Sequence, residues 1–249
     1  MIIYGDYHTH TTYSHGKGSI LDNAISAKQK GLKELAITDH GFSHRIYNVK
    51  RSDIENVITD CQKAEQATGV NILLGIEENL LSLDGKIGIL KRDLDFLDIV
   101  NVGYHKMARS VSARDAIELF MPNNLKFYTK RQIEKNTICL LKAIETQPIN
   151  ILTHINYGMP VNVEEVAKSA RQKGVFIELN GKRVCFSPAD MEALLKHDTQ
   201  FILNSDAHSP ERVGDVRNGM RYVVKYDIPE KNIVNLGKKP VFKDLKKFN

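Results

Sequence analysis

The chain has 249 residues, of which 42% are hydrophobic and 26% are charged, and its formal net charge is +5 at pH 7. This length and hydrophobic content exclude an intrinsically disordered chain and permit one large α/β barrel or two smaller domains. The modest positive charge permits an anionic substrate without indicating a nucleic-acid binder.

Short apolar runs alternate with longer amphipathic stretches along nearly the whole chain. Strands are predicted at Ile2–Tyr7, Glu34–Thr38, Asn71–Gly75, Leu97–Val102, Asn150–Thr153, Val175–Leu179 and Gln200–Asn204. Helices are predicted at Leu21–Lys30, Ser52–Thr68, Asp84–Asp95, Lys130–Glu145, Val163–Gln172 and Pro188–His197. This alternation predicts a parallel sheet with right-handed crossovers. Because composition does not change along the chain, we expect a single barrel domain over residues 1–249.

Two segments depart from this alternation. Residues 104–129 form a long insertion, interpreted either as a lid or substrate wall or as a plain surface excursion. The basic tail, residues 226–249, is expected to pack on the outside of the barrel. Its lysines lack interleaved aromatic residues, so nucleic acid is not the expected partner, although a small nucleotide substrate stays open.

The cysteines and the apolar runs indicate where the protein resides. Cys61, Cys139 and Cys185 are scattered, odd in number and without a CxxC pair, which is typical of reduced thiols in a cytoplasmic protein. We expect no signal peptide, because the first residues lack a basic region followed by an apolar stretch. No apolar run approaches the roughly 20 residues of a membrane span.

Most histidines lie at or just beyond the carboxyl end of a predicted strand. This set comprises His8, His10, His15, His40, His105, His154 and His208, and the carboxylates of Glu77 and Asp206 follow strands in the same way. In a parallel barrel these strand ends converge on one face, so distant residues meet in one pocket. His44 is interpreted as a residue at the pocket rim, and His197 as a surface residue.

The types of side chain in this set indicate a transition-metal site. Imidazole nitrogens combined with carboxylate oxygens suit zinc, iron or manganese. Residues i and i+2 of an extended strand point to the same side, so His8 and His10 can bind one ion. These nine candidate ligands exceed what one ion can use, so two or three divalent ions are expected.

Six motifs, taken in order, resemble those of the polymerase and histidinol phosphatase (PHP) superfamily. They are His8-Thr9-His10, Thr38-Asp39-His40, Gly75-Ile76-Glu77, Gly103-Tyr104-His105, Thr153-His154 and Ser205-Asp206-Ala207-His208. Residues 38–41 and 75–79 are most similar to the small, free-standing YcdX-like branch, in which the spacer before the residue matching His15 is one residue longer. Residues 209–214 resemble the histidinol phosphatase branch instead.

The resemblance implies a distorted (β/α)7 TIM-like barrel with a trinuclear metal site at the carboxyl ends of the strands. It implies that His8, His10, Glu77 and Asp206 hold one ion. Glu77 would bridge to a second ion held by His105 and His154. A third ion would be held by His15, His40 and His208.

The expected activity is hydrolysis of a phosphomonoester, with a metal-bound hydroxide as the nucleophile and no protein nucleophile. The substrate would be histidinol phosphate or another small phosphorylated metabolite or nucleotide. Candidate cations for its phosphate group are Lys106, Arg109, Lys182, Arg183 and Arg212, of which Arg183 and Arg212 lie close to predicted strand ends. Asn180, at the end of the sixth strand, is expected to orient a ligand or the substrate.

Three alternatives remain open from the sequence. A nuclease-type phosphodiesterase of the same superfamily would use the same ligands. An amidohydrolase also places His-x-His on its first strand, but it is expected to bridge its metals with a lysine on the fourth strand, and residues 100–102 offer none. A noncatalytic metal-binding module would hold its ions in a closed site without an open position.

Overall fold

The strands of this protein form one parallel sheet in which neighbours along the chain are also neighbours in space. The computed structural model describes residues 2–245. Its strands are β1 (Gly5–Asp6), β2 (Glu34–Ile37), β3 (Asn71–Asn79), β4 (Ile99–Gly103), β5 (Ile151–Leu152), β6 (Phe176–Asn180) and β7 (Phe201–Asn204). The order is β1 to β7 and every pairing is parallel.

A bridge beyond the strand ends brings β7 back to β1. Thr9 and Ala207 form a parallel bridge, and the backbone N–H of His10 donates to the carbonyl of Ala207 at 2.8 Å. The sheet is therefore a nearly closed barrel, and the prediction of a (β/α)7 TIM-like barrel is confirmed.

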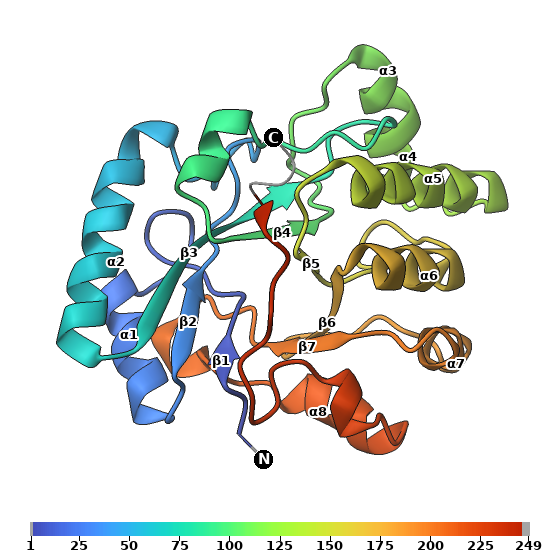
Figure 1. The fold of residues 1–249 in the computed structure, drawn as a ribbon. Coiled ribbons are helices and arrows are strands. Elements are labelled where there is room, and N and C mark those ends of the chain that lie inside the picture. Colours follow the sequence, from blue (N-terminus) through green and yellow to red (C-terminus); the bar gives the residue numbers. More distant parts are fainter. Residues whose placement is uncertain (1, 246–249) are drawn as a thin grey trace.

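Helices connect the strands and cover the outside of the barrel (Figure 1). They are α1 (Ile20–Gln29), α2 (Ile54–Thr68), α3 (Ala113–Asp115), α4 (Met121–Asn124), α5 (Lys130–Thr146), α6 (Val163–Lys173), α7 (Pro188–Lys196) and α8 (Arg217–Lys225). Ser19 begins α1 with a capping box that includes Asp22, and Gly69 ends α2 in the left-handed conformation at φ 73°. None of the helices in the described residues is long and apolar enough to cross a membrane.

The connection between β3 and β4 differs from the prediction. The helix predicted over Asp84–Asp95 is wrong, because this stretch contains only the 3-10 helix η2 (Lys91–Asp95). A turn at Gly85 precedes it, in which the N–H of Gly85 donates to Ser82 and the N–H of Leu81 donates to Lys86. Gly85 has φ 76°, and a Cβ atom there would lie 2.4 Å from the backbone of α5. The local geometry is therefore a tight turn that a helix cannot follow.

Three further elements differ from the predicted boundaries. The insertion at 104–129 contains α3, a π-helical turn at Ala116–Phe120 and α4 rather than an extended loop. No helix was predicted at α8. Strand β3 continues to Asn79, so Glu77 lies within the strand rather than after it.

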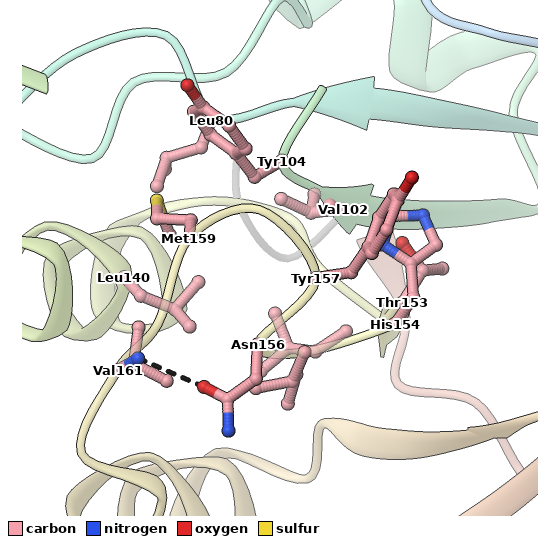
Figure 2. Close-up of a pocket in the computed structure, with 13 residues that line it drawn as sticks. Leu80, Val102, Tyr104, Leu140, Thr153, His154, Asn156, Tyr157, Met159 and Val161 are labelled. Carbon is pink, nitrogen blue, oxygen red and sulfur yellow. Dashed lines mark hydrogen bonds between the residues drawn. The ribbon is translucent and has the colours of Figure 1, made fainter. Parts of the chain in front are cut away.

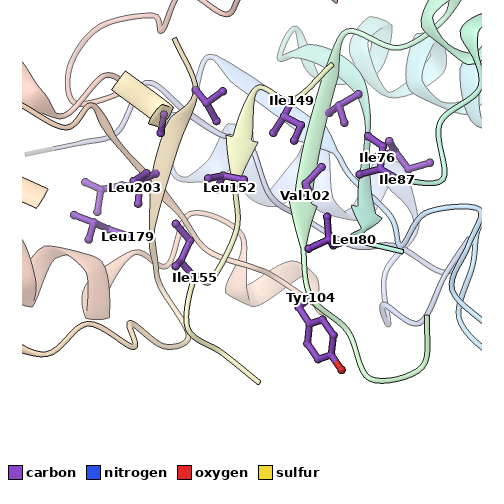
Figure 3. Close-up of a cluster of buried hydrophobic side chains, with 14 of the residues drawn as sticks. Ile76, Leu80, Ile87, Val102, Tyr104, Ile149, Leu152, Ile155, Leu179 and Leu203 are labelled. Atoms are coloured by element: carbon purple, nitrogen blue, oxygen red, sulfur yellow. The ribbon is translucent and has the colours of Figure 1, made fainter. Parts of the chain in front are cut away.

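Apolar side chains fill two regions on either side of the strands. The larger region lies between strands and helices, and Figure 3 shows part of it, including Val102, Leu152 and Leu179. The smaller region fills the barrel interior with residues on or beside each strand: Tyr7, Ala36, Leu73, Ile99, Ile151, Phe176 and Ile202. In TIM barrels such side chains form a packed layer.

The described part of the tail, residues 226–245, contacts this interior layer. The ring of Phe242 lies 5.1 Å from that of Tyr7 and 5.6 Å from that of Phe176. Asn235 donates to the carbonyls of Gly5 and Leu203, which joins the tail to β1 and β7 (Figure 1). The tail thus covers the amino-terminal end of the barrel and leaves the opposite end open for a site.

Candidate metal centre

The carboxylate of Glu77 is the centre of a histidine cluster at the carboxyl end of the barrel. Its Oε1 lies 3.2 Å from Nε2 of His8 and 2.9 Å from Nε2 of His154. Its Oε2 lies 3.5 Å from Nε2 of His10, 3.2 Å from Nδ1 of His40 and 3.5 Å from Nε2 of His105. Because Leu73, Gly75 and Glu77 alternate along β3, the same face that carries core residues below presents Glu77 to the site.

The remaining candidate ligands lie beside this cluster. The imidazole ring of His15 is 4.7 Å from that of His40 and 4.3 Å from that of His208. Asp206 Oδ1 is 3.6 Å from Nε2 of His10. All nine residues predicted as ligands therefore lie together, including His15, whose spacer is short.

Ligand atoms within 4.8 Å of one another form three groups among the described residues. They are His8, His10 and Asp206; then His40, Glu77 and His105; then His10, His15, His40 and His208. Each group combines side chains from at least two strand ends. Because His10 and His40 belong to two groups each, the groups are adjacent and not separate sites.

Several polar atoms in this cluster are buried without a hydrogen-bond partner. They are Nδ1 of His10, His15, His40 and His154, and Oε2 of Glu77. Buried polar atoms are almost always paired in native proteins, so a group of unpaired polar atoms at one place indicates a site that binds a ligand. The donor set, imidazole with carboxylate, fits divalent transition metals.

The pKa shifts of three candidate ligands suit metal binding, and those of two others oppose it. Burial lowers the pKa of His10 and of His40 to about 3, and that of His15 to about 4, so these imidazoles are unprotonated at neutral pH. Burial opposes ionisation of Glu77, but nearby imidazoles, first His8 and then His105, hold the pKa of its carboxyl well below the usual value. Neutral imidazoles beside an ionised carboxylate are the forms that bind a metal, whereas Glu77 raises the pKa of His8 and of His154 despite their burial, so a bound metal would replace a proton on these two.

Buried carboxylates that the sequence analysis did not single out hold the ligands in place. Glu178 Oε1 is 2.7 Å from Nδ1 of His8, and its Oε2 accepts the backbone N–H of His154 at 2.9 Å. Asp39 accepts hydrogen bonds from the N–H and hydroxyl of Thr11 and from the hydroxyl of Ser14, which fixes the loop that carries His15. The two-residue spacing of Glu178 from Asn180 was the available signal, since it places both on the inner face of β6.

Asn180 lies where the sequence analysis expected it, at the end of β6. Its Oδ1 accepts the backbone N–H groups of Lys182 and Arg183, at 2.7 and 3.0 Å. Its Nδ2 donates to Glu178 at 2.9 Å and lies 3.3 Å from Oδ2 of Asp206. This amide therefore connects the cluster to the turn that carries two cations.

Those two cations border the open pocket above the cluster. Its walls are His15, His40, Glu77, His105, His154, Tyr157, Lys182, Arg183, Asp206 and His208. The guanidinium carbon of Arg183 lies 4.0 Å from the ring centroid of Tyr157, a cation–π contact that orders the arginine. Tyr157 was not singled out in the sequence.

The other basic residues proposed from the sequence do not line this pocket. Arg212 forms an ion pair with Asp215, and Lys106 and Arg109 have exposed side chains. His44 is buried, with its ring stacked on that of His40 at 4.9 Å. His197 ends α7, where its Nε2 lies 3.3 Å from Glu164, well apart from the cluster.

Tyr157 belongs to the loop after β5, and this loop forms one wall of a small apolar cavity (Figure 2). The cavity is lined by residues that include Leu80, Val102 and Met159. Within the loop, Asn156 Oδ1 accepts the backbone N–H of Val161 at 3.0 Å, the dashed contact in Figure 2. This bond closes the loop and holds Tyr157 beside His154.

Comparison with known proteins identifies the family. The family model of the PHP domain matches residues 6–182. The chain belongs to the PHP domain family. A protein of Caldanaerobacter subterraneus subsp. tengcongensis, named as a probable phosphatase, is 30% identical over 247 residues, which cover 92% of this chain and 86% of the relative. A probable phosphatase of Clostridium novyi is 28% identical over 258 residues, covering 97% and 93% of the two chains.

The solved structures agree with the barrel fold. Histidinol phosphate phosphatase from Lactococcus lactis, solved with zinc, L-histidinol and phosphate, superposes with a TM-score of 0.61 at 16% identity, covering 99% of both chains. At this identity the likeness shows the fold alone. The prediction of a PHP-family member is confirmed. An amidohydrolase is expected to carry a metal-bridging lysine on its fourth strand, and β4 carries no lysine.

Proposed function

We propose that this chain, a phosphatase of the PHP family, hydrolyses a small phosphomonoester at a centre of three divalent transition metals. The observation that carries the proposal is the position of Glu77, whose two oxygens lie within 3.5 Å of five imidazoles beneath a pocket bordered by Lys182 and Arg183. A carboxylate so placed can bridge two ions.

The proposed assignment is the one that the resemblance implies; the ligand groups support most of it, and they differ in placing His40 with Glu77 and His105, and His10 with His15 and His208. His8, His10 and Asp206, with Glu77, would hold one ion. Glu77, His105 and His154 would hold a second, since Nε2 of His154 lies 2.9 Å from Glu77 Oε1. His15, His40 and His208 would hold the third. Zinc, manganese and iron all suit these donors.

The chemistry that bound ions would supply is a lowered pKa of coordinated water, from about 15.7 to near 7, and neutralisation of charge on the phosphoryl group. The chain itself contributes orientation and charge. Arg183, ordered on Tyr157, and Lys182 would bind the phosphate oxygens, and Asn180 fixes the turn that carries both. The described residues that line the pocket include no Ser, Thr or Cys, and its histidines and carboxylates are assigned to the metals, so the expected nucleophile is water.

The proposal is tested by metal analysis combined with a phosphatase assay. Purified protein is stripped with a chelator, reloaded with zinc, manganese or iron, and assayed with p-nitrophenyl phosphate, histidinol phosphate and nucleoside monophosphates. We expect bound metal and phosphate release with at least one ion. Metal without phosphatase activity under every condition would contradict the proposal.

Variants of two histidines connect this activity to the cluster. His10→Ala removes a buried ligand of two groups and is expected to abolish activity and reduce metal content. His197→Ala is the matched control, because His197 contacts Glu164 away from the pocket. If His10→Ala kept full activity, the proposed site would be wrong.

A further inference from the structure

Four exposed apolar or aromatic side chains lie on the loops after β2, β4 and β5, at the end of the barrel that carries the metal pocket. Ile46 and Tyr47 follow β2, Met107 follows β4 and Tyr157 follows β5, and their exposed fractions are 57%, 43%, 42% and 44%. We call these four residues the apolar rim. Large apolar side chains grouped on a protein surface are typical of binding sites.

The loops that carry the apolar rim lie side by side and are ordered by backbone hydrogen bonds. The N–H of Arg45 donates to the carbonyl of Met107 at 2.9 Å, and His44 and Ala108 form an antiparallel bridge. Ile46, Tyr47 and Met107 therefore come from one joined pair of loops. Such support fixes the wall before any ligand arrives.

The apolar rim reaches the candidate metal ligands on two sides. The ring of Tyr47 stacks on that of His15 with centroids 4.6 Å apart. The ring of Tyr157 lies 5.8 Å from that of His154 and is part of the pocket wall. A molecule held at the metal centre would therefore contact these rings.

The two cationic side chains that line the pocket, Lys182 and Arg183, lie outside the apolar rim. Lys182 and Arg183 follow β6, next in the barrel after β5, and Arg183 meets the apolar rim at Tyr157. If these cations and the metal centre bind the phosphate oxygens, the alcohol part of the substrate would face the loops after β2 and β4. The cationic wall thus suits the phosphate group of a phosphomonoester, and the apolar rim suits its alcohol part.

Acidic side chains are nearly absent from these loops. Among the described residues 7–19, 38–50, 104–112, 153–162 and 181–187, the only carboxylate is that of Asp39. Asp39 is buried and occupied by hydrogen bonds from Thr11 and Ser14. A leaving group with an amino group would find no free carboxylate in these loops and would face Lys182 and Arg183, because the carboxylates of the pocket wall, Glu77 and Asp206, are proposed metal ligands.

We propose that the apolar rim is a subsite for the leaving group, and that it selects phosphomonoesters of aromatic or apolar alcohols that carry no positive charge. This inference rests on the proposed phosphatase function. Apolar contact and ring stacking on Tyr47 and Tyr157 supply the selectivity, because both rings are half exposed and held in place.

The test compares three aryl phosphates whose leaving groups have closely matched acidity: phenyl, 2-naphthyl and 4-(aminomethyl)phenyl phosphate. The metal-loaded enzyme should hydrolyse 2-naphthyl phosphate with a kcat/KM about fivefold or more above that for phenyl phosphate, because the second ring adds apolar contact. The aminomethyl compound should fall below phenyl phosphate. A 2-naphthyl to phenyl ratio near one, or a preference for the amine, would overturn the subsite.

A double variant and a matched control assign any preference to the apolar rim. Ile46→Ser with Met107→Ser should bring the 2-naphthyl to phenyl ratio toward one. Val224→Ser removes an equally apolar side chain, 75% exposed on α8, and should keep the wild-type ratio. An unchanged ratio in the double variant overturns the assignment.

The same assays separate this inference from the proposed function. Hydrolysis of p-nitrophenyl phosphate with equal kcat/KM for the phenyl and naphthyl compounds overturns the subsite alone. Failure to hydrolyse any of the four compounds with any of the three metals overturns both.

Discussion

Glu178 lies directly behind the candidate metal ligand His8, with its Oε1 2.7 Å from Nδ1 of the imidazole. The contact turns Nε2 of His8 toward Glu77, at 3.2 Å. The other oxygen of Glu178 accepts the N–H of His154, a residue in the left-handed backbone region at φ 29°. One buried carboxylate therefore positions ligands from two of the proposed metal sites.

Glu178→Gln should weaken metal binding without removing a ligand. The single oxygen of a glutamine can accept a hydrogen bond from the imidazole of His8 or from the N–H of His154, but not from both. Its NH2 group would then face the remaining donor. Loss of such a supporting carboxylate typically costs about 10–100-fold in metal affinity. Metal titration followed by calorimetry measures the effect, and Glu164→Gln, at an exposed surface pair, is the control. Wild-type affinity in Glu178→Gln would show that the contact is structural only.

Asp39→Asn should affect mainly the third metal. Asp39 binds Thr11 and Ser14, and the same loop holds His15 beside His40 and His208. An amide cannot accept all of these hydrogen bonds, so the loop should loosen. We expect metal analysis to show about one ion fewer per chain, with the remaining ions retained. Loss of all ions together would mean that the loop supports the whole cluster.

Arg183→Ala should weaken binding of the phosphate group. Arg183 lines the pocket, whereas Arg212, also proposed from the sequence, is paired with Asp215. Loss of a charge-assisted hydrogen bond predicts a fall in kcat/KM of about 10–100-fold. Steady-state kinetics with p-nitrophenyl phosphate should show this fall for Arg183→Ala and a much smaller one for Arg212→Ala. A larger fall for Arg212→Ala than for Arg183→Ala would show that the phosphate group binds at the loop after β7 instead.

The thiols should be nearly inert at pH 8 in the folded protein. Burial raises the pKa of Cys61 and of Cys139 to about 12, and it also raises that of the half-buried Cys185. Because the thiolate is the reactive form, lowering the pH from 12 to 8 leaves almost none of it. A chromogenic disulfide reagent should label the native protein slowly and all three thiols quickly in urea. Fast labelling of two or more native thiols would contradict this packing.

The sequence was sufficient to predict the elements that have strong local patterns. The β2, β6 and β7 strands and the α2 and α6 helices lie within a few residues of their predicted bounds, because their apolar periodicity and their C-cap glycines at 69 and 174 are local signals. The helix predicted over Asp84–Asp95 was wrong because the approach of α5 to Gly85, a long-range contact, decides that segment.

The candidate ligands themselves could be found from the chain alone. A parallel barrel collects the carboxyl ends of its strands, so His8, Glu77 and Asp206 could be predicted to meet once the alternation of strands and helices was seen. Their order along the chain carries the family resemblance, and the PHP domain match agrees with it. Position relative to a strand end is a property that one sequence encodes directly.

Only the tertiary structure decided which other side chains serve this site. Nothing local distinguishes Arg183 from Arg212, yet one stacks on Tyr157 at the pocket and the other pairs with Asp215. The contacts by which Glu178 and Asp39 position the candidate ligands follow only from how β6 and the loop after β2 pack against the loop after β1. Contacts between distant segments depend on how helices and loops pack across the barrel, and side-chain direction follows from that packing rather than from residue order.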